Sequence, residues 1–425
     1  MEQYFTFDPA VTEAARQALE SCRGDFDRIE RTAEHNGQKV LAAFIRNHVS
    51  EACLKGSTGY GYDDLGREKL DRIFAESLGA EDALVRHNFM SGTHTLVTAL
   101  FGVLRPGDLM TCVTGTPYDT LQETLGLRGA GVGGFREFGI RYRQRELLPD
   151  GTPDLEAVAQ AAAESRMIYV QRSRGYSLRP SLRVEQIGRI VQAAKAANPG
   201  VVVMVDNCYG EFVEPLEPCD VGADLMAGSL IKNPGGGIAL TGGYIAGRHD
   251  LVEACACRLS CPGVGREIGC THEQLRPMYQ GVFFAPTVVE AALKTAVFAA
   301  ALFGGLGFGV TPGPHEVRAD IIQAVKLQNA QRLCAFCKGI QKGSPVDSFV
   351  TPEPWDMPGY DSKVIMAAGA FTLGASIELS ADAPLREPFA VWMQGGLTWP
   401  SGKTGVMLAA QSMLEEGLIG PGGAD

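Results

Sequence analysis

Residues 201–207, VVVMVDN, and residues 224–238, DLMAGSLIKNPGGGI, decide the fold. The first stretch opens with a continuous apolar run, which is typical of a strand buried on both faces of a parallel sheet. The second is a short apolar run that leads to a single lysine, Lys232, followed by Asn-Pro and three glycines. A lysine on a solvated surface does not need such a setting. The two stretches therefore direct attention to the polar residues that end the predicted strands.

From about residue 80 the chain alternates short apolar runs with helical stretches. Further runs are DALVRHNFM (82–90), DLMTCVTG (108–115), RMIYVQRS (166–173) and GGYIAG (242–247), and RVEQIGRIVQAAKAANPG (183–200) reads as a helix. Alternating strands and helices predict an α/β fold with a mostly parallel sheet covered by helices on both faces. In such sheets ligands bind beyond the carboxyl ends of the strands.

The length of 425 residues predicts two domains or more. We expect an N-terminal helical segment over residues 1–55, a large domain over 56–290 that holds the ligand site, and a smaller C-terminal α/β domain over 291–425. After about residue 285 the pattern predicts some 50 helical residues. Strands at 366–373 and 375–380 and a helix over 403–418 are expected to follow.

Composition excludes several classes of protein. The net charge of −11 disfavours nucleic-acid binding, because phosphate backbones attract lysine and arginine. Residues 295–310, TAVFAAALFGGLGFGV, are too few for a membrane span and predict a buried helix followed by a turn. No basic-then-apolar signal segment is seen in the first 20 residues. We expect a cytoplasmic enzyme without membrane or nucleic-acid partners.

The eleven cysteines do not predict a metal site. Cys255, Cys257, Cys261 and Cys270 are irregularly spaced, and Cys334 and Cys337 form one C-x-x-C within a predicted helix. A zinc site calls for paired C-x-x-C motifs or neighbouring histidines. We therefore expect free thiols in a reducing compartment and no metal.

Three predicted strands lead to groups suited to an anion and a flat ring. Ser91, Gly92 and Thr93 open a helix, where free N–H groups and the helix dipole favour phosphate, although they also suit an ordinary cap. Tyr118 follows the strand near residue 110 and could cover a flat ligand or simply pack. Asp206 ends the strand at 201–206, where a carboxylate requires a partner, which is either a ligand or a structural salt bridge or helix cap.

Two further strand ends complete the set. Gln171, Arg172, Ser173 and Arg174 form either a ligand-orienting loop or a solvated basic patch. Ser229 stands three residues before Lys232, and the glycines that follow permit close backbone approach. A lysine in such a pocket can have a lowered pKa and attack a carbonyl.

Taken together, these groups match the requirements of pyridoxal 5'-phosphate (PLP). The aldehyde of PLP needs a lysine, its ring nitrogen needs a carboxylate, and its phosphate needs a helix N-terminus. A nucleotide-binding protein would instead show G-x-G-x-x-G directly after a strand. GVGGF at 131–135 has the wrong spacing and follows no good strand.

The sequence also resembles the methionine gamma-lyase family, known too as aluminium resistance proteins, within the cystathionine/methionine group of PLP enzymes. The resemblance covers nearly the whole chain. It rests on GYGYDDLGREKLD, SGTHT, QRSRGYSLRPSL, VDNCYGEF, GSLIKNPGGGIALTGGYIAG, YQGVFFAPTVVEAALK and SIELSADAPLREPFAVWMQGGLTW. It implies the fold type I PLP-dependent transferase fold, with a seven-stranded type of sheet, and a homodimer or homotetramer with shared active sites.

The resemblance implies roles for individual residues. Lys232 matches the lysine that binds the cofactor, Asp206 the partner of the ring nitrogen, and Tyr118 the stacking tyrosine. The phosphate loop matches Ser91, Gly92 and Thr93, with Ser229 as the hydroxyl before the lysine. From its place at a strand end, Gln171 is expected to be a further cofactor contact.

Other positions depart from the family pattern. Tyr60 and Tyr62 fall where the group has Tyr-x-Arg reaching a neighbouring subunit's phosphate, and Arg67 could supply the missing charge. The arginine that binds the substrate carboxylate is absent from its usual place, so Arg386 is the first candidate and Arg174 the second.

The expected activity is a carbon–sulfur lyase acting on a sulfur-containing amino acid. Lys232 removes the α-proton, and a thiol leaves from the β or γ carbon, with Lys232 and Tyr118 as acid–base groups. The alternatives are another PLP reaction, of aminotransferase, racemase or aldolase type, and a PLP-binding tolerance protein with little turnover.

Overall fold

The computed structural model describes residues 4–356 and 362–420, and the chain divides into two compact units. The large unit consists of residues 35–175 and 179–285. The small unit contains the described parts of residues 1–34, 176–178 and 286–425. The N-terminal residues thus pack in the same unit as the C-terminal ones.

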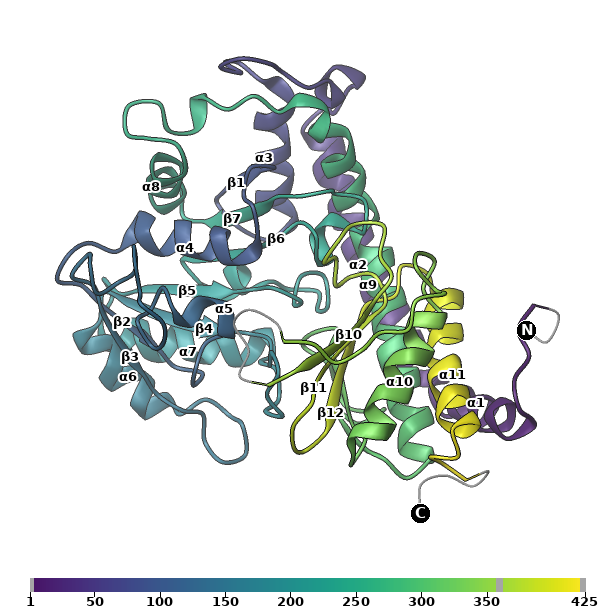
Figure 1. Ribbon diagram of the computed structural model, residues 1–425. Helices are drawn as coiled ribbons and strands as arrows, with labels where there is room; N and C mark the ends of the chain where they lie inside the picture. The colour runs from purple at the N-terminus through teal and green to yellow at the C-terminus, as the bar shows by residue number, and fades with distance from the viewer. Residues whose placement is uncertain (1–3, 357–361, 421–425) are drawn as a thin grey trace. The chain divides into compact units, whose positions relative to one another are not determined.

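The large unit is built on a seven-stranded sheet (Figure 1). Its strand order is β1-β7-β6-β5-β4-β2-β3, and β7 alone is antiparallel to its neighbours. The strands are β1 (Asp82–Arg86), β2 (Leu109–Cys112), β3 (Arg141–Gln144), β4 (Met167–Gln171), β5 (Val202–Asp206), β6 (Leu225–Ser229) and β7 (Gly243–Gly247). The prediction of a mostly parallel sheet is confirmed.

Helices cover both faces of this sheet. On one face α4 packs against α8 and over β6 and β7, and α6 packs beside α7 over β2 and β4 on the other (Figure 1). The helices with residues in this unit are α2 (Arg23–Arg46), α3 (Leu65–Ser77), α4 (Gly92–Val103), α5 (Asp119–Gln122), α6 (Leu155–Glu164), α7 (Val184–Ala197), α8 (His249–Leu259) and α9 (Leu275–Gly305). Of these, α2 and α9 also continue into the small unit.

Short 3-10 helices lie in the connections of the large unit. They are η1 (Glu51–Leu54), η2 (Pro218–Val221), η3 (Asn233–Gly235), η4 (Gly265–Glu267) and η5 (His272–Gln274).

Central strands β4, β5 and β6 are buried at every position, which explains their continuous apolar sequences. In register, Asp206 of β5 lies beside Gln171 of β4 and Ala227 of β6. The sheet therefore brings the polar strand ends to one edge.

The small unit holds a five-stranded antiparallel sheet of order β10-β11-β12-β9-β8. Its strands are β8 (Gly309–Thr311), β9 (Gln323–Lys326), β10 (Val364–Ala368), β11 (Ser380–Pro384) and β12 (Ala390–Gln394). The helices lying wholly in this unit are α1 (Pro9–Ser21), α10 (Ala330–Lys342) and α11 (Trp399–Glu415). An apolar core of residues from α1, α9, α10, α11 and the sheet holds it together.

Two predictions for this part of the chain are wrong. The helix expected to run some 50 residues ends at Gly305, and the short strands β8 and β9 follow before α10 begins. The strand expected at 375–380 is mostly a turn, because the Glu378 carboxylate accepts the backbone N–H groups of Phe371 and Thr372 at 2.9 and 3.0 Å. The real strand starts at Ser380, and β12 was not predicted.

Helix α9, as part of the run His272–Gly305, is long and apolar enough to cross a membrane. However, 78% of its most apolar window is buried inside the protein. This burial is that of a core helix. The prediction of a buried helix followed by a turn is therefore confirmed, since α9 ends at Gly305.

Candidate active site

Lys232 lies in the turn that follows β6. Its N–H donates to the Ser229 carbonyl at 3.3 Å, and η3 begins at the next residue. Gly235 closes this turn so tightly that a Cβ there would lie 1.6 Å from the Leu230 carbonyl oxygen. The turn thus requires glycine for space, as the sequence predicted. It directs the Lys232 ammonium over the ring of Tyr209, with Nζ 4.1 Å from the ring centroid.

Asp206 is the last residue of β5, the strand that pairs with β6 ahead of the lysine turn. It is only 6% exposed. Its Oδ1 accepts the Cys208 N–H at 3.1 Å and its Oδ2 accepts the Tyr169 hydroxyl at 3.4 Å. Burial raises the pKa of Asp206, whereas the positive charge of Lys232 opposes that rise. A buried carboxylate beside a cation is suited to hold a protonated ring nitrogen.

The electrostatic environment of Lys232 differs from the expectation. Burial by itself lowers the pKa of its amine, but Cys208, Tyr209, Asp206 and Glu211 together raise the pKa above the ordinary value. The expected lowered pKa is therefore wrong for this state of the protein. The physical reason is that acidic groups surround the amine, a feature that the glycine-rich turn alone does not reveal.

The predicted phosphate loop opens α4. Ser91 is the N-cap, and its Oγ accepts the His94 N–H at 3.1 Å, so the expected helix start is confirmed. A Cβ placed on Gly92 would lie 3.4 Å from Ser229 Cβ, 3.6 Å from Cys208 Sγ and 4.0 Å from Lys232 Nζ. The N-terminus of α4 and the lysine turn therefore face the same small space. Thr93 Oγ1 lies 2.6 Å from Thr120 Oγ1.

Tyr118 and Gln171 are held together at the neighbouring strand ends. The Tyr118 N–H donates to Gln171 Oε1 at 2.6 Å, and Gln171 Nε2 donates to the Ser173 carbonyl at 3.1 Å. Gly175 lies against the tyrosine, since a Cβ on it would be 3.3 Å from Tyr118 Cδ2. Because Gln171 pairs in register with Asp206, this group joins the same edge of the sheet.

Ser229 carries a signal for a bound ligand. Its side chain is 1% exposed, and its hydroxyl has no hydrogen-bond partner within the described chain. A buried hydroxyl without a partner is costly, and such a group commonly awaits a ligand or water. The hydroxyl stands beside the helix N-terminus at Gly92. These residues fit a phosphate at α4, a ring nitrogen at Asp206 and an aldehyde at Lys232.

Three functional candidates were missed by sequence reasoning, namely Cys208, Tyr209 and Glu211. All follow Asp206 within DNCYGEF, and all contribute to the electrostatic environment of Lys232. Tyr209 has a left-handed backbone with φ of 72°, which a bulky residue rarely adopts. The motif was visible in the sequence, but the lysine lies more than 20 residues away, so no local pattern joined the two.

Tyr60 and Tyr62 lie at the protein surface, 69% and 57% exposed, with their rings stacked at 5.6 Å. Their expected contact with a neighbouring subunit's phosphate stays a prediction. Arg67 does not offer a free charge to that role. It is 2% exposed, and its Nη1 donates to the carbonyls of Gly61 and Gly269 at 2.7 Å each, so it fixes the loop that carries the two tyrosines.

The three arginines predicted as ligand-binding candidates, Arg172, Arg174 and Arg386, lie in different environments. Arg172 is fully buried and pairs with Glu214 at 2.9 Å and Glu217 at 3.4 Å, so it belongs neither to a ligand loop nor to a solvated patch. Arg174 is buried, and its N–H and Nε donate to Ser181 Oγ at 3.1 and 3.4 Å. Arg386 is exposed in the loop between β11 and β12 of the small unit. The carboxylate-binding role of Arg386 or Arg174 stays a prediction.

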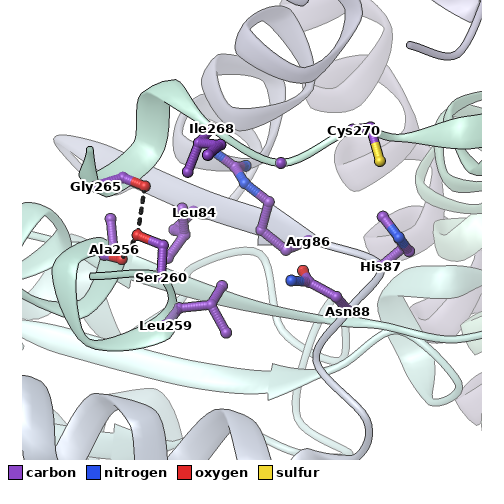
Figure 2. A pocket seen from close by; sticks show the side chains of 11 residues that line it. Leu84, Arg86, His87, Asn88, Ala256, Leu259, Ser260, Gly265, Ile268 and Cys270 are labelled. Atoms are coloured by element: carbon purple, nitrogen blue, oxygen red, sulfur yellow. Dashed lines mark hydrogen bonds between the residues drawn. The ribbon is translucent and has the colours of Figure 1, made fainter. Parts of the chain in front are cut away.

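A separate cavity of about 220 Å³ lies beyond the end of β1 (Figure 2). Its polar lining includes Arg86, His87, Asn88 and Cys270, and no predicted cofactor ligand lines it. The Arg86 guanidinium is already paired with Asp71 at 2.8 Å. This pairing neutralises the one arginine in the lining, so the cavity gives no independent sign of an anion site.

One cluster of the described residues has the side chains of a metal site, Asp82, His249 and Glu253. Arg266 already occupies it, with Nη2 2.7 Å from Asp82 Oδ2 and Nε 2.5 Å from Glu253 Oε1. A guanidinium among these carboxylates opposes a cation, so we interpret the cluster as an ion-pair network. The expectation of no metal stays a prediction.

Comparisons with known proteins agree with this geometry. The family model described as methionine gamma-lyase matches residues 11–414. The chain is 47% identical over 416 residues to the uncharacterized protein YnbB of Bacillus subtilis (strain 168), covering 97% of this chain and 99% of YnbB. The crystal structure of a carbon–sulfur lyase involved in aluminium resistance from Clostridium novyi NT superposes with a TM-score of 0.93 at 45% identity, covering 97% of this chain and 98% of that one.

A more distant structure agrees in fold. The PLP-dependent protein YhfS of Escherichia coli has a TM-score of 0.60 at 15% identity and covers 91% of this chain and 97% of its own. At that identity the likeness concerns the fold, which is that of fold type I PLP enzymes. With the family model spanning most of the sequence, this chain belongs to the methionine gamma-lyase family.

Proposed function

We propose that this protein is a PLP-dependent carbon–sulfur lyase that acts on a sulfur-containing amino acid. The observation that carries the proposal is the convergence of three groups at one edge of the sheet. These are the amine of Lys232, the buried carboxylate of Asp206 and the N-terminus of α4 with the unpartnered Ser229 hydroxyl. The C. novyi relative, described as a carbon–sulfur lyase, supports the reaction class.

Each group has a chemical task. Bound PLP supplies an electron sink for the bonds at the substrate's α carbon. Lys232 Nζ takes the α-proton, and Asp206 keeps a proton on the ring nitrogen. Tyr118, whose backbone N–H donates to Gln171 Oε1, is assigned to cover the ring and to give a proton to the leaving sulfur. The N–H groups of α4 and Ser229 Oγ hold the phosphate.

The overall reaction balances without an oxidant. The carbon–sulfur bond at the β or γ carbon breaks, the sulfur leaves as a thiol with one proton, and one water is consumed. The remaining products are a 2-oxo acid and ammonia. The substrate carboxylate is assigned to an arginine, with Arg386 and Arg174 as the candidates.

We extend the proposal to the setting of the enzyme. A homodimer or homotetramer is expected, with the exposed pair Tyr60 and Tyr62 reaching a second subunit's phosphate. A cytoplasmic location agrees with the eleven cysteines, all of which are free thiols in the structure. Size-exclusion chromatography with light scattering measures the assembly.

The first test is the absorption spectrum of the purified protein with and without added PLP. We expect the visible band of lysine-bound PLP, followed by release of thiol and 2-oxo acid when sulfur amino acids are supplied. No visible band after PLP addition would overturn the cofactor assignment. A band with amino-group transfer instead of thiol release would indicate an aminotransferase, and a band without any product would indicate a binding protein.

Gly92→Ala tests the assigned phosphate space. The new methyl group meets only ordinary contacts in the protein alone, at 3.4 Å or more, so the fold is expected to remain intact. With phosphate beside α4 the methyl group crowds the ligand, and we expect the dissociation constant for PLP to rise about tenfold or more, about 1.4 kcal/mol. Gly37→Ala in α2 is the matched control, because nothing lies within 4 Å of its Cβ. Equal PLP affinity in both variants would contradict the assignment.

A further inference from the structure

Glu211 is a buried acid that is hydrogen-bonded to the lysine turn through its backbone. Its side chain is 0% exposed, and Oε1 accepts the Tyr244 hydroxyl at 2.9 Å. Its backbone carbonyl accepts Nδ2 of Asn233, the residue after Lys232, at 3.0 Å. A Cβ on Gly228 would lie 2.4 Å from Oε1, so β6 leaves room for this carboxyl just before Ser229.

The contacts of Glu211 are those of a neutral acid. Oε2 is buried and has no hydrogen-bond partner among the described residues. Across that same part of the chain, no basic nitrogen lies within 4.0 Å of this carboxyl, whereas Arg172 pairs with Glu214 and Glu217 instead. An ionised carboxylate with one hydroxyl donor in such a place would be strongly disfavoured, and a proton removes most of that cost.

The surrounding charges favour the same state. The titratable and charged groups that act on Glu211 are Cys208, Glu217, Tyr244 and Lys232, while Arg172 and Lys39 act on Glu217. Burial, with the charge of Glu217, raises the pKa of Glu211 to about 8, although Tyr244 and Lys232 oppose the rise.

We propose that Glu211 is a positioning residue that stays protonated at neutral pH and limits the negative charge around Lys232. In alkaline solution it releases its proton. The new anion then strengthens the hold of the Lys232 nitrogen on its own proton. The coupling to PLP rests on the proposed function, whereas the protonated state of Glu211 does not.

The protonation state is measured in the protein without cofactor. Infrared difference spectra between wild type and Glu211→Gln at pH 6.5 are expected to show the carbonyl stretch of an undissociated carboxylic acid that is absent from the variant. This band should fade by about pH 9.5, because pH 6.5 lies below and pH 9.5 above the Glu211 pKa of about 8. Glu156→Gln, on the exposed start of α6, is the control and should leave the band unchanged. No acid band at pH 6.5 would overturn the proposal.

The coupling is measured on the PLP-loaded protein. The pH titration of the visible band is expected to have a lower midpoint in Glu211→Gln than in wild type, by roughly one pH unit, because the alkaline anion is missing. Identical titrations would overturn the coupling, and absence of any visible band would instead refute the cofactor assignment.

If Glu211→Gln does not fold, Tyr244→Phe supplies the second test. It removes the hydroxyl that stabilises the anion, so the acid band should persist to higher pH than in wild type. A band that fades at the same pH or lower would count against the proposal.

Discussion

Replacing Lys232 with alanine is expected to remove the visible band of lysine-bound PLP and to lower turnover by on the order of 10³-fold or more. The amine has two tasks in the proposed reaction, as the group that binds the cofactor and as the base that takes the α-proton. Alanine can do neither. Absorption spectroscopy and assay of thiol release measure the two losses separately.

Lys232→Arg tests whether the site needs the nucleophilic amine of lysine or only its positive charge. Arginine keeps a cation near Asp206 but cannot act as a nucleophilic amine at working pH, so this variant should lose the band as fully as alanine does. Lys342→Ala, on the exposed end of α10, is the control and should behave as wild type. A normal band in Lys232→Arg or in Lys232→Ala would refute the assignment of this lysine.

Replacing Arg172 with methionine is expected to lower the free energy of unfolding by about 3–5 kcal/mol. The guanidinium is fully buried between Glu214, Glu217 and the Asn207 side chain, which accepts a hydrogen bond from Nη1 at 2.7 Å. Methionine fills much of the volume but leaves the buried Glu217 without its ion-pair partner and leaves Glu214 with only the surface Arg183. The destabilisation comes from those charges rather than from a cavity.

Urea denaturation of the protein without PLP measures this effect. Arg183→Met is the matched control, since Arg183 reaches Glu214 from the surface at 3.8 Å and such exposed pairs contribute about 1 kcal/mol or less. Burial raises the pKa of Glu217 even with Arg172 present. Without the cation that pKa rises further, so the deficit of Arg172→Met should shrink as the pH falls. Equal effects of the two substitutions would contradict the structural role of Arg172.

Much of the candidate site was predictable because the functional residues at strand ends stand next to recognisable local sequence patterns. The apolar run before Asp206, the cap at Ser91 and the glycines after Lys232 each show in a short window of sequence. Parallel strands bring such ends to one edge, so the grouping followed from the fold class. The short strands of the small unit were less predictable. Glu378 turns a strand-like segment into a loop by accepting two backbone N–H groups.

The sequence by itself determined the α/β fold class and the order of the strand-end residues, and it predicted PLP as the cofactor. Only the tertiary structure decided that Arg172 is a buried ion-pair partner and that Arg67 fixes a loop. It also decided that Cys208, Tyr209 and Glu211 surround Lys232. The physical reason is that charge, burial and hydrogen bonding depend on distances between residues far apart in the chain. Local sequence patterns determine which ionisable side chains the strand ends contribute. Packing determines which of those side chains are buried, paired and charged.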